Sequence, residues 1–429
     1  MPRSLVLAAA AAALVAGAPL ASQNPSPVRR PPSPACAPDN VGLTLPSGFC
    51  AVVVADSLGR ARHLAALPNG DLAVAIRGAE GGVQVLRDTT GDGVADVIGA
   101  FAPPGGGGGT GIAFSGGALY FATDAAVFRW RWQPGQLEPG GPPDTVVSGL
   151  TNRRSHAAKG IALGPGGALF VNIGAPSNAC QEQDRTPGSA GQDPCPLLEI
   201  AGGIWRFDVN RTGQTQADGE RYATGLRNAL ALAVDPASGD LFAAQHGRDQ
   251  LAANWPALYT EAESAELPAE EVFRIEEGGD YGWPYCYYDP GREQKVLGPE
   301  YGGDGERVGR CASADEPVLA FPAHWAPNAI TFYSGTAFPA KYRGGLFIAF
   351  HGSWNRAPLP QGGYKVMFVP FASGKPAGEP EVFADGFAGS DVSPGGALHR
   401  PTGLAVGPDG SLYVSDDKGG RVYKIVYRR

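Results

Sequence analysis

The chain has no excess of basic residues: Lys and Arg total 34 against 42 Asp and Glu, a formal net charge of −8 at pH 7. A nucleic-acid-binding protein needs a basic face, so this balance argues against nucleic acid as the main partner. Long apolar runs are absent from the sequence after residue 16, which predicts no stable insertion in a membrane. The cysteines lack the paired spacing of zinc sites, which argues against metal binding through sulfur.

Glycine and proline are abundant instead, with 63 and 39 residues in a chain of 429. They are spread between short apolar runs, a pattern typical of many tight turns joining many strands. Hydrophobic residues make up 43% of the chain, enough for a sizeable core. A chain of this length can hold one large repeat domain or about two to three ordinary domains.

The N-terminus carries a positive charge at Arg3, then a Leu/Val/Ala run, then a small-residue site at Ala16-Gly-Ala18. This pattern predicts a secretory signal peptide over residues 1–21, so the protein is expected to be periplasmic or secreted. An uncleaved N-terminal anchor is the alternative, which the shortness of the apolar run disfavours.

Residues 22–40 are rich in proline and serine and are expected to form a linker ahead of a single domain over residues 41–429. The six cysteines form three pairs that are close in sequence, and an even number in an exported chain favours disulfides. Several connectivities are open to six cysteines. We expect neighbours to pair, which gives Cys36–Cys50, Cys180–Cys195 and Cys286–Cys311.

One phrase recurs along the chain: an apolar strand, a turn with glycine or proline, and a second strand that begins with leucine. Its six copies begin at Leu64, Ile112, Ile161, Leu232, Phe338 and Leu404. Most copies are followed by a second hairpin, so each unit offers about four strands, the content of a propeller blade. A lone blade cannot bury both faces of its sheet, so the blades must stack around an axis.

The predicted fold is therefore all-β: a six-bladed β-propeller with four-stranded blades. Residues 49–55 precede the first unit and are expected to supply the outer strand that closes the ring with the C-terminus. A β-sandwich or two β-domains is the competing architecture, which the regularity of the copies disfavours. Long insertions are expected at 176–200, 249–271 and 285–325, and insertions of this size are usually functional or stapled.

Polar side chains occupy equivalent places directly before the repeated phrase. His156 precedes the phrase of the third unit and Arg400 that of the sixth, while Arg227 and Asn228 precede that of the fourth. Loops that enter the blades converge at one mouth of a propeller, so we expect these side chains to face one cavity. Arginines there suit a ligand with several carboxylates, and a histidine among them can act as a general base.

Four segments carry a resemblance to a known family: GLRNALAL from Gly225, QHGRDQLAANWP from Gln245, EEVFRIEEGGDYGWPYCYYD from Glu270 and FHGSWNRAPLPQGGYKVMFVPF from Phe350. With them, the chain from about Leu45 onward resembles the soluble sugar dehydrogenases that depend on pyrroloquinoline quinone (PQQ). This is the glucose/sorbosone dehydrogenase family, and the last two segments especially resemble its sorbosone branch. The resemblance implies a six-bladed propeller that oxidises a sugar with PQQ held on calcium.

The resemblance also implies roles for single residues. His156 matches the base that takes the hydroxyl proton at the anomeric carbon while hydride moves to the quinone. Arg227 and Asn228 match a pair that touches the quinone, although this chain departs from the family's Pro-Gln after Asn228. Arg400 matches an arginine that grips a cofactor carboxylate.

A lysine in the family's fifth blade has no clean match in this chain. Arg356, Lys365 and His351 are the candidates to replace it.

For calcium, the resemblance implies backbone carbonyl ligands at Gly247 and Arg248, the second of which is usually proline. Acidic residues near the Gly-Trp-Pro run, here Glu270, Glu271 and Asp289, can hold a structural calcium in that family. A solvated acidic loop is the alternative.

A second acidic segment, Asp88 to Asp96, has an abbreviated calcium-loop spacing. It lacks the distal glutamate, which favours an ordinary Asp/Gly turn.

Two other classes of function stay open. Six-bladed propellers also host calcium-dependent lactonases and other hydrolases, whose site needs acidic and amide ligands around a central metal. A binding propeller without chemistry is the third class. Basic residues at the predicted mouth favour an anionic cofactor. The resemblance then implies an exported quinoprotein that oxidises an aldose or related sugar at an anomeric hydroxyl or aldehyde hydrate. Such a protein would pass electrons to a cytochrome, a copper protein or a quinone.

Overall fold

The computed structural model describes residues 1–2, 36–153 and 155–428, the last two lying in one compact unit, Ser33–Arg429. The predicted signal peptide (1–21) and linker (22–40) fall mostly outside the described residues. In the described part of the chain, no helix has the length and apolar character that crossing a membrane requires.

Six sheets, each with four antiparallel main strands, make up the fold. The first three blades comprise β2 (Arg60–Ala66), β3 (Leu72–Arg77), β4 (Gly82–Arg87) and β5 (Val97–Phe101); β6 (Gly109–Ser115), β7 (Ala118–Thr123), β8 (Val127–Arg131) and β9 (Asp144–Ser148); β10 (Ile161–Leu163), β11 (Ala168–Ile173), β12 (Gly203–Asp208) and β14 (Glu220–Thr224). The last three comprise β15 (Ala231–Val234), β16 (Leu241–Gln245), β17 (Glu270–Ile275) and β21 (Leu319–Phe321); β22 (Pro327–Phe332), β23 (Leu346–Phe350), β24 (Lys365–Val369) and β27 (Glu381–Ala384); β28 (Pro401–Val406), β29 (Leu412–Asp416), β30 (Arg421–Tyr427) and β1 (Phe49–Ala55).

Smaller elements decorate these blades. Short strands add parallel edges or separate hairpins: β13 (Gln214–Thr215), β18 (Gly279–Asp280), β19 (Cys286–Asp289), β20 (Gln294–Leu297), β25 (Phe371–Ala372) and β26 (Lys375–Pro376). The helices are α1 (Leu251–Asn254) and α2 (Glu261–Glu266), with the 3-10 turns η1 (Asn40–Gly42), η2 (Pro165–Gly167), η3 (Pro196–Glu199), η4 (Gln216–Asp218), η5 (Pro299–Tyr301), η6 (Gly309–Ser313) and η7 (Ala340–Tyr342).

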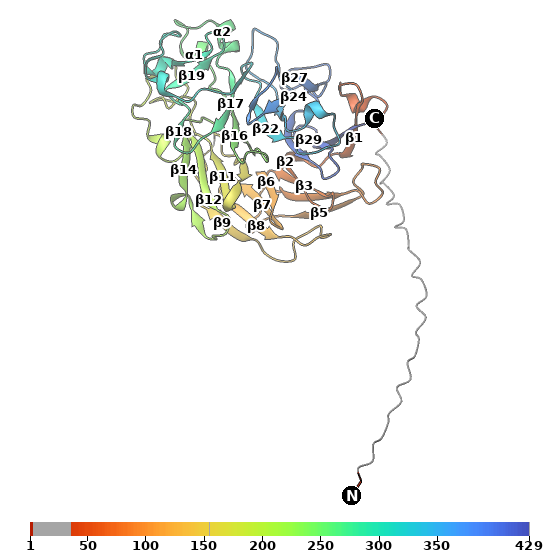
Figure 1. Cartoon of the computed structure of the whole chain (residues 1–429). Helices are drawn as coiled ribbons and strands as arrows, with labels where there is room; N and C mark the ends of the chain where they lie inside the picture. The colour runs from red at the N-terminus through yellow and green to blue at the C-terminus, as the bar shows by residue number, and fades with distance from the viewer. Residues whose placement is uncertain (3–35, 154, 429) are drawn as a thin grey trace. The chain divides into compact units, whose positions relative to one another are not determined.

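The blades close into a ring. The innermost strands β2, β6, β10, β15, β22 and β28 are neighbours in this order, and β28 also neighbours β2. β1 completes the sixth blade by pairing antiparallel with the C-terminal strand β30, with Phe49 opposite Tyr427. Figure 1 shows this closure as red β1 beside the blue strands near the C-terminus. The predicted six-bladed propeller and its closing strand are both confirmed.

The fifth blade starts earlier than the repeated phrase predicts. We expected its copy to begin at Phe338, but the inner strand β22 ends at Phe332. Phe338 lies in the connection to β23, where its ring stacks on Tyr333 and meets Phe49 edge to face. The copy is loose because this connection packs aromatic rings between two blades instead of forming a tight turn.

The connections that surround the mouth follow from the antiparallel order of the strands. Loops between the second and third strands of a blade leave at the same end as loops that enter the next blade. These connections are short in the first two blades, 78–81 and 124–126, and long in the third and fourth, 174–202 and 246–269. The first two predicted insertions therefore rise beside the mouth.

The third insertion follows β18 and carries the β19–β20 hairpin; Figure 1 shows β19 gathered with α1 and α2. All three expected disulfides are present: Cys36–Cys50, Cys180–Cys195 and Cys286–Cys311. Two of them lie in the insertions, where turns and loops bury less apolar surface than the blades do.

Candidate functional site

His156 lies in the loop that enters the third blade, directly before β10. Its Nδ1–H donates to the backbone carbonyl of Ala175. Because a carbonyl only accepts, this bond places the proton on Nδ1 and leaves the lone pair on Nε2. Burial and the nearby charge of Arg227 lower the pKa of His156 to about 3. The ring is therefore neutral at pH 7, with a proton acceptor at Nε2.

Ala175 links His156 to the predicted Arg-Asn pair. The N–H of Ala175 donates to the backbone carbonyl of Arg227 at 2.8 Å, while its own carbonyl accepts from His156. Gly174 leaves no room for a side chain, since a Cβ there would lie 2.6 Å from His156 Cβ and 2.8 Å from Asn228 Oδ1. The structure thus brings His156, Arg227 and Asn228 together at one mouth.

Arg227 is only 3% exposed, and its guanidinium is partly paired. Nη1 donates to the Gly247 carbonyl at 2.6 Å and Nη2 donates to Asp249 Oδ2 at 2.9 Å. Its Nε is buried and has no partner among the described protein groups. Leaving a buried N–H unpaired is unfavourable, so this group suits an oxygen of a bound ligand.

Two histidines link different blades near the site. His63 on β2 donates from Nε2 to the Asn328 carbonyl of the fifth blade at 2.8 Å, so this bond crosses from the first blade. His246 donates from Nε2 to the Pro327 carbonyl at 3.1 Å. Burial, followed by a neighbouring arginine in each case, lowers the pKa of both histidines to about 4. Both are therefore neutral at pH 7.

Arg400 lies across the ring, beside a charged cluster. Its Nε donates to the His351 carbonyl at 2.9 Å and its Nη2 to the Gly352 carbonyl at 2.5 Å. The His351 ring bonds Asp417 Oδ1 at 2.8 Å, and the other oxygen of Asp417 pairs with Arg62 on β2. Like Arg227, Arg62 has a buried Nε without a partner among the described groups.

Arg62 and Asp417 are not among the residues predicted from the sequence. Arg62 lies two residues before the repeated phrase at Leu64, whereas His156 and Arg400 lie five and four residues before theirs, so the same rule points to this region of the chain but not to Arg62 itself. Asp417 gives no comparable signal, because its partners lie in two other blades.

The three candidates for the fifth-blade lysine have different surroundings. Lys365 pairs with Asp385 at 2.9 Å, next to the end of the outer strand β27. Arg356 donates from Nη1 to the Ala323 carbonyl at 2.8 Å. His351 is the one that contacts both Arg400 and the Asp417 cluster.

The carbonyls predicted to ligate calcium lie beside Arg227. The Gly247 carbonyl already accepts from the Arg227 cation, which opposes a second cation at the same oxygen. The Arg248 side chain is buried in a bidentate ion pair with Glu300, with exposures of 5% and 0%. Calcium on Gly247 would therefore require Arg227 to withdraw.

The predicted acidic ligands have other partners. Glu271 pairs with the buried Lys295 at 2.9 Å and accepts from Gln245 at 2.6 Å. Asp289 caps the turn between β19 and β20 by accepting from the N–H of Gly291. Across the described residues, no three His, Cys, Asp or Glu side chains are grouped to hold a metal.

The third acidic residue of that set, Glu270, accepts from the backbone N–H groups of Gly247 and Ala326. In the Asp88 segment, both oxygens of Asp88 accept from N–H groups of its own loop, at Gly91 and Gly93. This is the geometry of an Asp/Gly turn.

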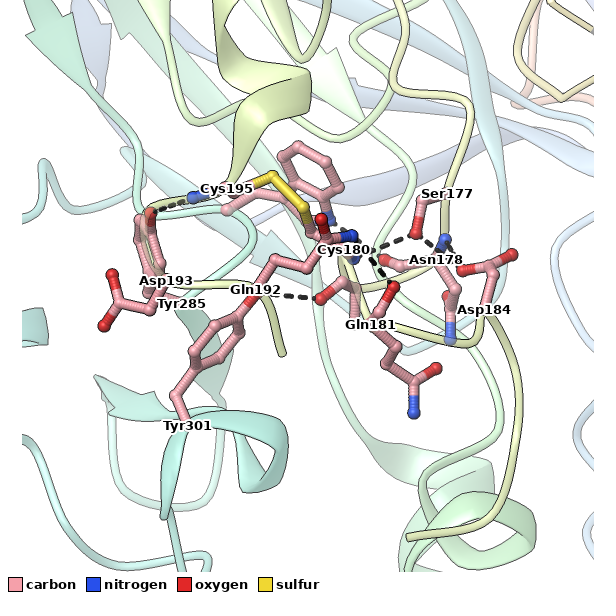
Figure 2. Close-up of a disulfide and its surroundings, with 12 residues drawn as sticks. Ser177, Asn178, Cys180, Gln181, Asp184, Gln192, Asp193, Cys195, Tyr285 and Tyr301 are labelled. Atoms are coloured by element: carbon pink, nitrogen blue, oxygen red, sulfur yellow. Dashed lines mark hydrogen bonds between the residues drawn. A yellow bond between two sulfur atoms is a disulfide. The ribbon is translucent and has the colours of Figure 1, made fainter. Parts of the chain in front are cut away.

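The Cys180–Cys195 disulfide anchors the third-blade insertion beside the site. Figure 2 shows Asn178 on one side of this disulfide and Tyr285 on the other. The Tyr285 hydroxyl accepts from the Cys195 N–H at 2.9 Å, and Trp283 Nε1 donates to the Asn178 carbonyl at 2.9 Å. Trp283 of the GDYGWP run and Tyr285 just after it thus hold the insertion in place. The role of Trp283 seen here is structural.

The model of the TrAA12-like family matches residues 43–428. An uncharacterized protein of Borreliella burgdorferi is 32% identical over 213 residues, 49% of this chain and 49% of that protein. The PQQ-dependent pyranose dehydrogenase of Coprinopsis cinerea is 33% identical over 187 residues, 37% of this chain and 25% of that protein. The matches thus span half or less of these relatives.

Solved structures share the fold. The holo PQQ domain of the C. cinerea pyranose dehydrogenase aligns with a TM-score of 0.72 at 21% identity, covering 92% of this chain and 98% of that domain. A calcium structure of a Trichoderma reesei enzyme of carbohydrate-active family AA12 aligns with a TM-score of 0.73 at 20% identity, covering 90% and 97%.

Proposed function

Because the chain belongs to the TrAA12-like family, we propose that it is a sugar oxidoreductase that uses PQQ as its electron acceptor. The chemistry of the mouth supports this assignment. PQQ is a flat quinone with several carboxylates, and such a ligand needs arginine donors that have hydrogen-bonding capacity to spare.

One observation carries the proposal: Arg227 and Arg62 each have a buried, unpaired Nε–H among the described groups, on opposite sides of a mouth that also holds His156. These two donors suit an anionic ligand that binds between them. Arg400 is linked to Arg62 by a chain of contacts: it donates to the His351 carbonyl, the His351 ring bonds Asp417, and Asp417 pairs with Arg62. When bound, PQQ supplies a two-electron acceptor for hydride from the sugar.

His156 is proposed as the general base. The Ala175 carbonyl holds its proton at Nδ1, so Nε2 is the atom that takes the sugar hydroxyl proton. A pKa of about 3 makes it a weak base in the ligand-free protein. Burial is the main cause of this low pKa and the Arg227 charge is the second, so an anionic ligand beside Arg227 would offset only the smaller of the two.

The finer parts of the proposal concern calcium, location and the electron acceptor. Calcium on the carbonyl oxygens of the Gly247-Arg248 segment is part of the proposal only if Arg227 withdraws from the Gly247 carbonyl, and no proton or binding step here is assigned to it. We propose a periplasmic or secreted enzyme that oxidises an aldose or related sugar at an anomeric hydroxyl or aldehyde hydrate. Its electrons would pass to a cytochrome, a copper protein or a quinone.

A calcium-dependent lactonase or other hydrolase is the alternative. It would need acidic and amide ligands free to surround a central metal, whereas Asp249 and Asp417 at this mouth are each paired with an arginine, Arg227 and Arg62. This arrangement favours the anionic cofactor.

The test is dye reduction by purified apoprotein with PQQ and calcium added separately and together, on a panel of aldoses, sorbosone and lactones. We expect turnover that needs PQQ and that falls by roughly 10²–10⁴-fold in His156→Ala. The matched control is Lys341→Ala, which removes an exposed surface pair with Glu381 and should keep full activity. Absence of PQQ binding with and without calcium, or lactone hydrolysis in its place, would reject the proposal.

A further inference from the structure

Asp249 occupies a central position among the loops of the mouth. It follows Gly247-Arg248, and its side chain is 14% exposed. Oδ2 accepts from Arg227 Nη2 at 2.9 Å and from Arg185 Nη2 at 3.1 Å. Oδ1 accepts from Asn355 Nδ2 at 2.8 Å. One carboxylate thus joins the third-blade insertion, the entry to the fourth blade and a loop of the fifth.

The backbone of Asp249 is fixed independently of its side chain. Asn178, fully buried in the disulfide-bonded insertion, donates from Nδ2 to the Asp249 carbonyl and accepts at Oδ1 from the Asp249 N–H, both at 2.9 Å. Figure 2 shows Asn178 close to the Cys180–Cys195 disulfide. The carboxylate is therefore presented from a rigid support.

This arrangement determines which donors of Arg227 are used. Nε and Nη2 lie on the same edge of a guanidinium, the edge that a carboxylate can grip with both oxygens. Here Asn355 holds Asp249 Oδ1, so the carboxylate meets Arg227 through Oδ2 alone and Nε–H stays unpaired.

We propose that Asp249 is a positioning residue: it orients Arg227 through one oxygen so that the Arg227 Nε–H remains available to an oxygen of the anionic cofactor. Asn355 keeps the second oxygen of Asp249 away from that donor. This inference rests on the proposed function, because it concerns how the same mouth binds its ligand. Asp249 itself needs no contact with the cofactor.

The test measures PQQ affinity of the apoprotein by fluorescence titration, alongside thermal unfolding without PQQ. Asp249→Asn should weaken PQQ binding about tenfold or more, the effect of one misplaced charged hydrogen bond. Arg185→Ala removes the other arginine from the same carboxylate oxygen and should leave the affinity within about twofold. Unchanged or tighter binding in Asp249→Asn would overturn the proposal.

A double-mutant cycle separates positioning from general damage. If Asp249 acts through Arg227, adding Asp249→Asn to Arg227→Ala should cause no further loss of PQQ affinity. Additive losses would overturn the inference and leave the proposed function standing. If Arg227→Ala itself leaves PQQ affinity unchanged, the proposed cofactor site fails, and the positioning role fails with it.

A second variant covers the case in which Asp249→Asn does not fold. Asn355→Ala frees Asp249 Oδ1 to reach Arg227 Nε, so the ion pair becomes bidentate and the donor is lost to the ligand. We expect weaker PQQ binding with no fall in the melting temperature of the apoprotein. Full affinity in Asn355→Ala would contradict the proposal.

Discussion

The same connection between the second and third strands of a blade is built in two ways in this propeller. In the second blade it is 124–126, and in the third it is 174–202. The short version holds one half-buried ion pair, Asp124 with Arg77, while the long version carries a disulfide and Asn178, whose side chain holds the Asp249 backbone. The blades are held mainly by apolar burial, whereas the insertions around the site are held by buried polar pairs and covalent links.

The buried pair Arg248–Glu300 should show the largest effect on stability. Glu300→Ala leaves the Arg248 charge buried and also removes the acceptor of Trp255 Nε1, so we expect a loss of about 3–5 kcal/mol. Urea unfolding measures it. As a control, replacing both partners by Met and Leu should recover much of the loss, since the cost comes from the orphaned charge; a loss below about 1 kcal/mol in Glu300→Ala would contradict this account.

Removal of the Cys180–Cys195 disulfide is the next largest expected effect. Its cysteines are 15 residues apart, and opening a loop of that length costs about 3 kcal/mol in the chain-entropy account. The matched control is Cys36→Ser with Cys50→Ser, 14 residues apart but in the closing blade. Both pairs should lose similar stability, while PQQ affinity should fall only for the first pair, because only that loop supports Asn178.

Lys159, at the entry to the third blade, should make stability depend on pH. Burial lowers its folded-state pKa to about 8, partly opposed by Asp124, while the unfolded value is about 10.5. The unfolded chain therefore binds more protons between these values, so stability should rise as pH increases from 8 to 10, by roughly 2–3 kcal/mol. Urea unfolding at pH 7, 9 and 10 should show a smaller rise in Lys159→Met; equal slopes would rule this assignment out.

The half-buried pair between Asp124 of the short connection and Arg77 of β3 should matter least. Asp124→Asn breaks a bidentate contact with Arg77, with both side chains more than a fifth exposed, 22% and 29%. Pairs of this kind contribute about 0–1 kcal/mol, so the change in unfolding free energy should be at most about 1 kcal/mol. If Asp124→Asn lowered the unfolding free energy as much as Glu300→Ala does, the polar contacts of the short and long connections would not differ in strength.

Much of the fold could be predicted from the sequence, because blade repeats and neighbouring cysteines leave local signals. The phrase at Leu404 and the segment 49–55 were enough to expect a ring closed by both ends of the chain. The resemblance to PQQ-dependent soluble sugar dehydrogenases is confirmed at the level of the family. The start of the fifth blade predicted from the repeated phrase, at Phe338, was wrong, because aromatic packing between blades replaces a tight turn there.

The charged contacts of the site could not be predicted in the same way. Glu271 looked like a metal ligand because its partner Lys295 is distant in sequence and meets it only in the folded chain. Asn178 and Asp249 likewise come from separate insertions. Repeats determine where a loop leaves the propeller, whereas ion pairing within the loops depends on side chains that carry no periodic signal.

The pairing of β1 with β30 has a consequence for how the molecule forms. The strand nearest the beginning of the fold meets the strand nearest its end, so the sixth blade contains the pairing with the longest separation along the chain. Such contacts form late, because the intervening chain must already be organised before the two strands meet. During synthesis, β1 therefore stays unpaired until β30 has been made, and closure of the ring is the last step of folding.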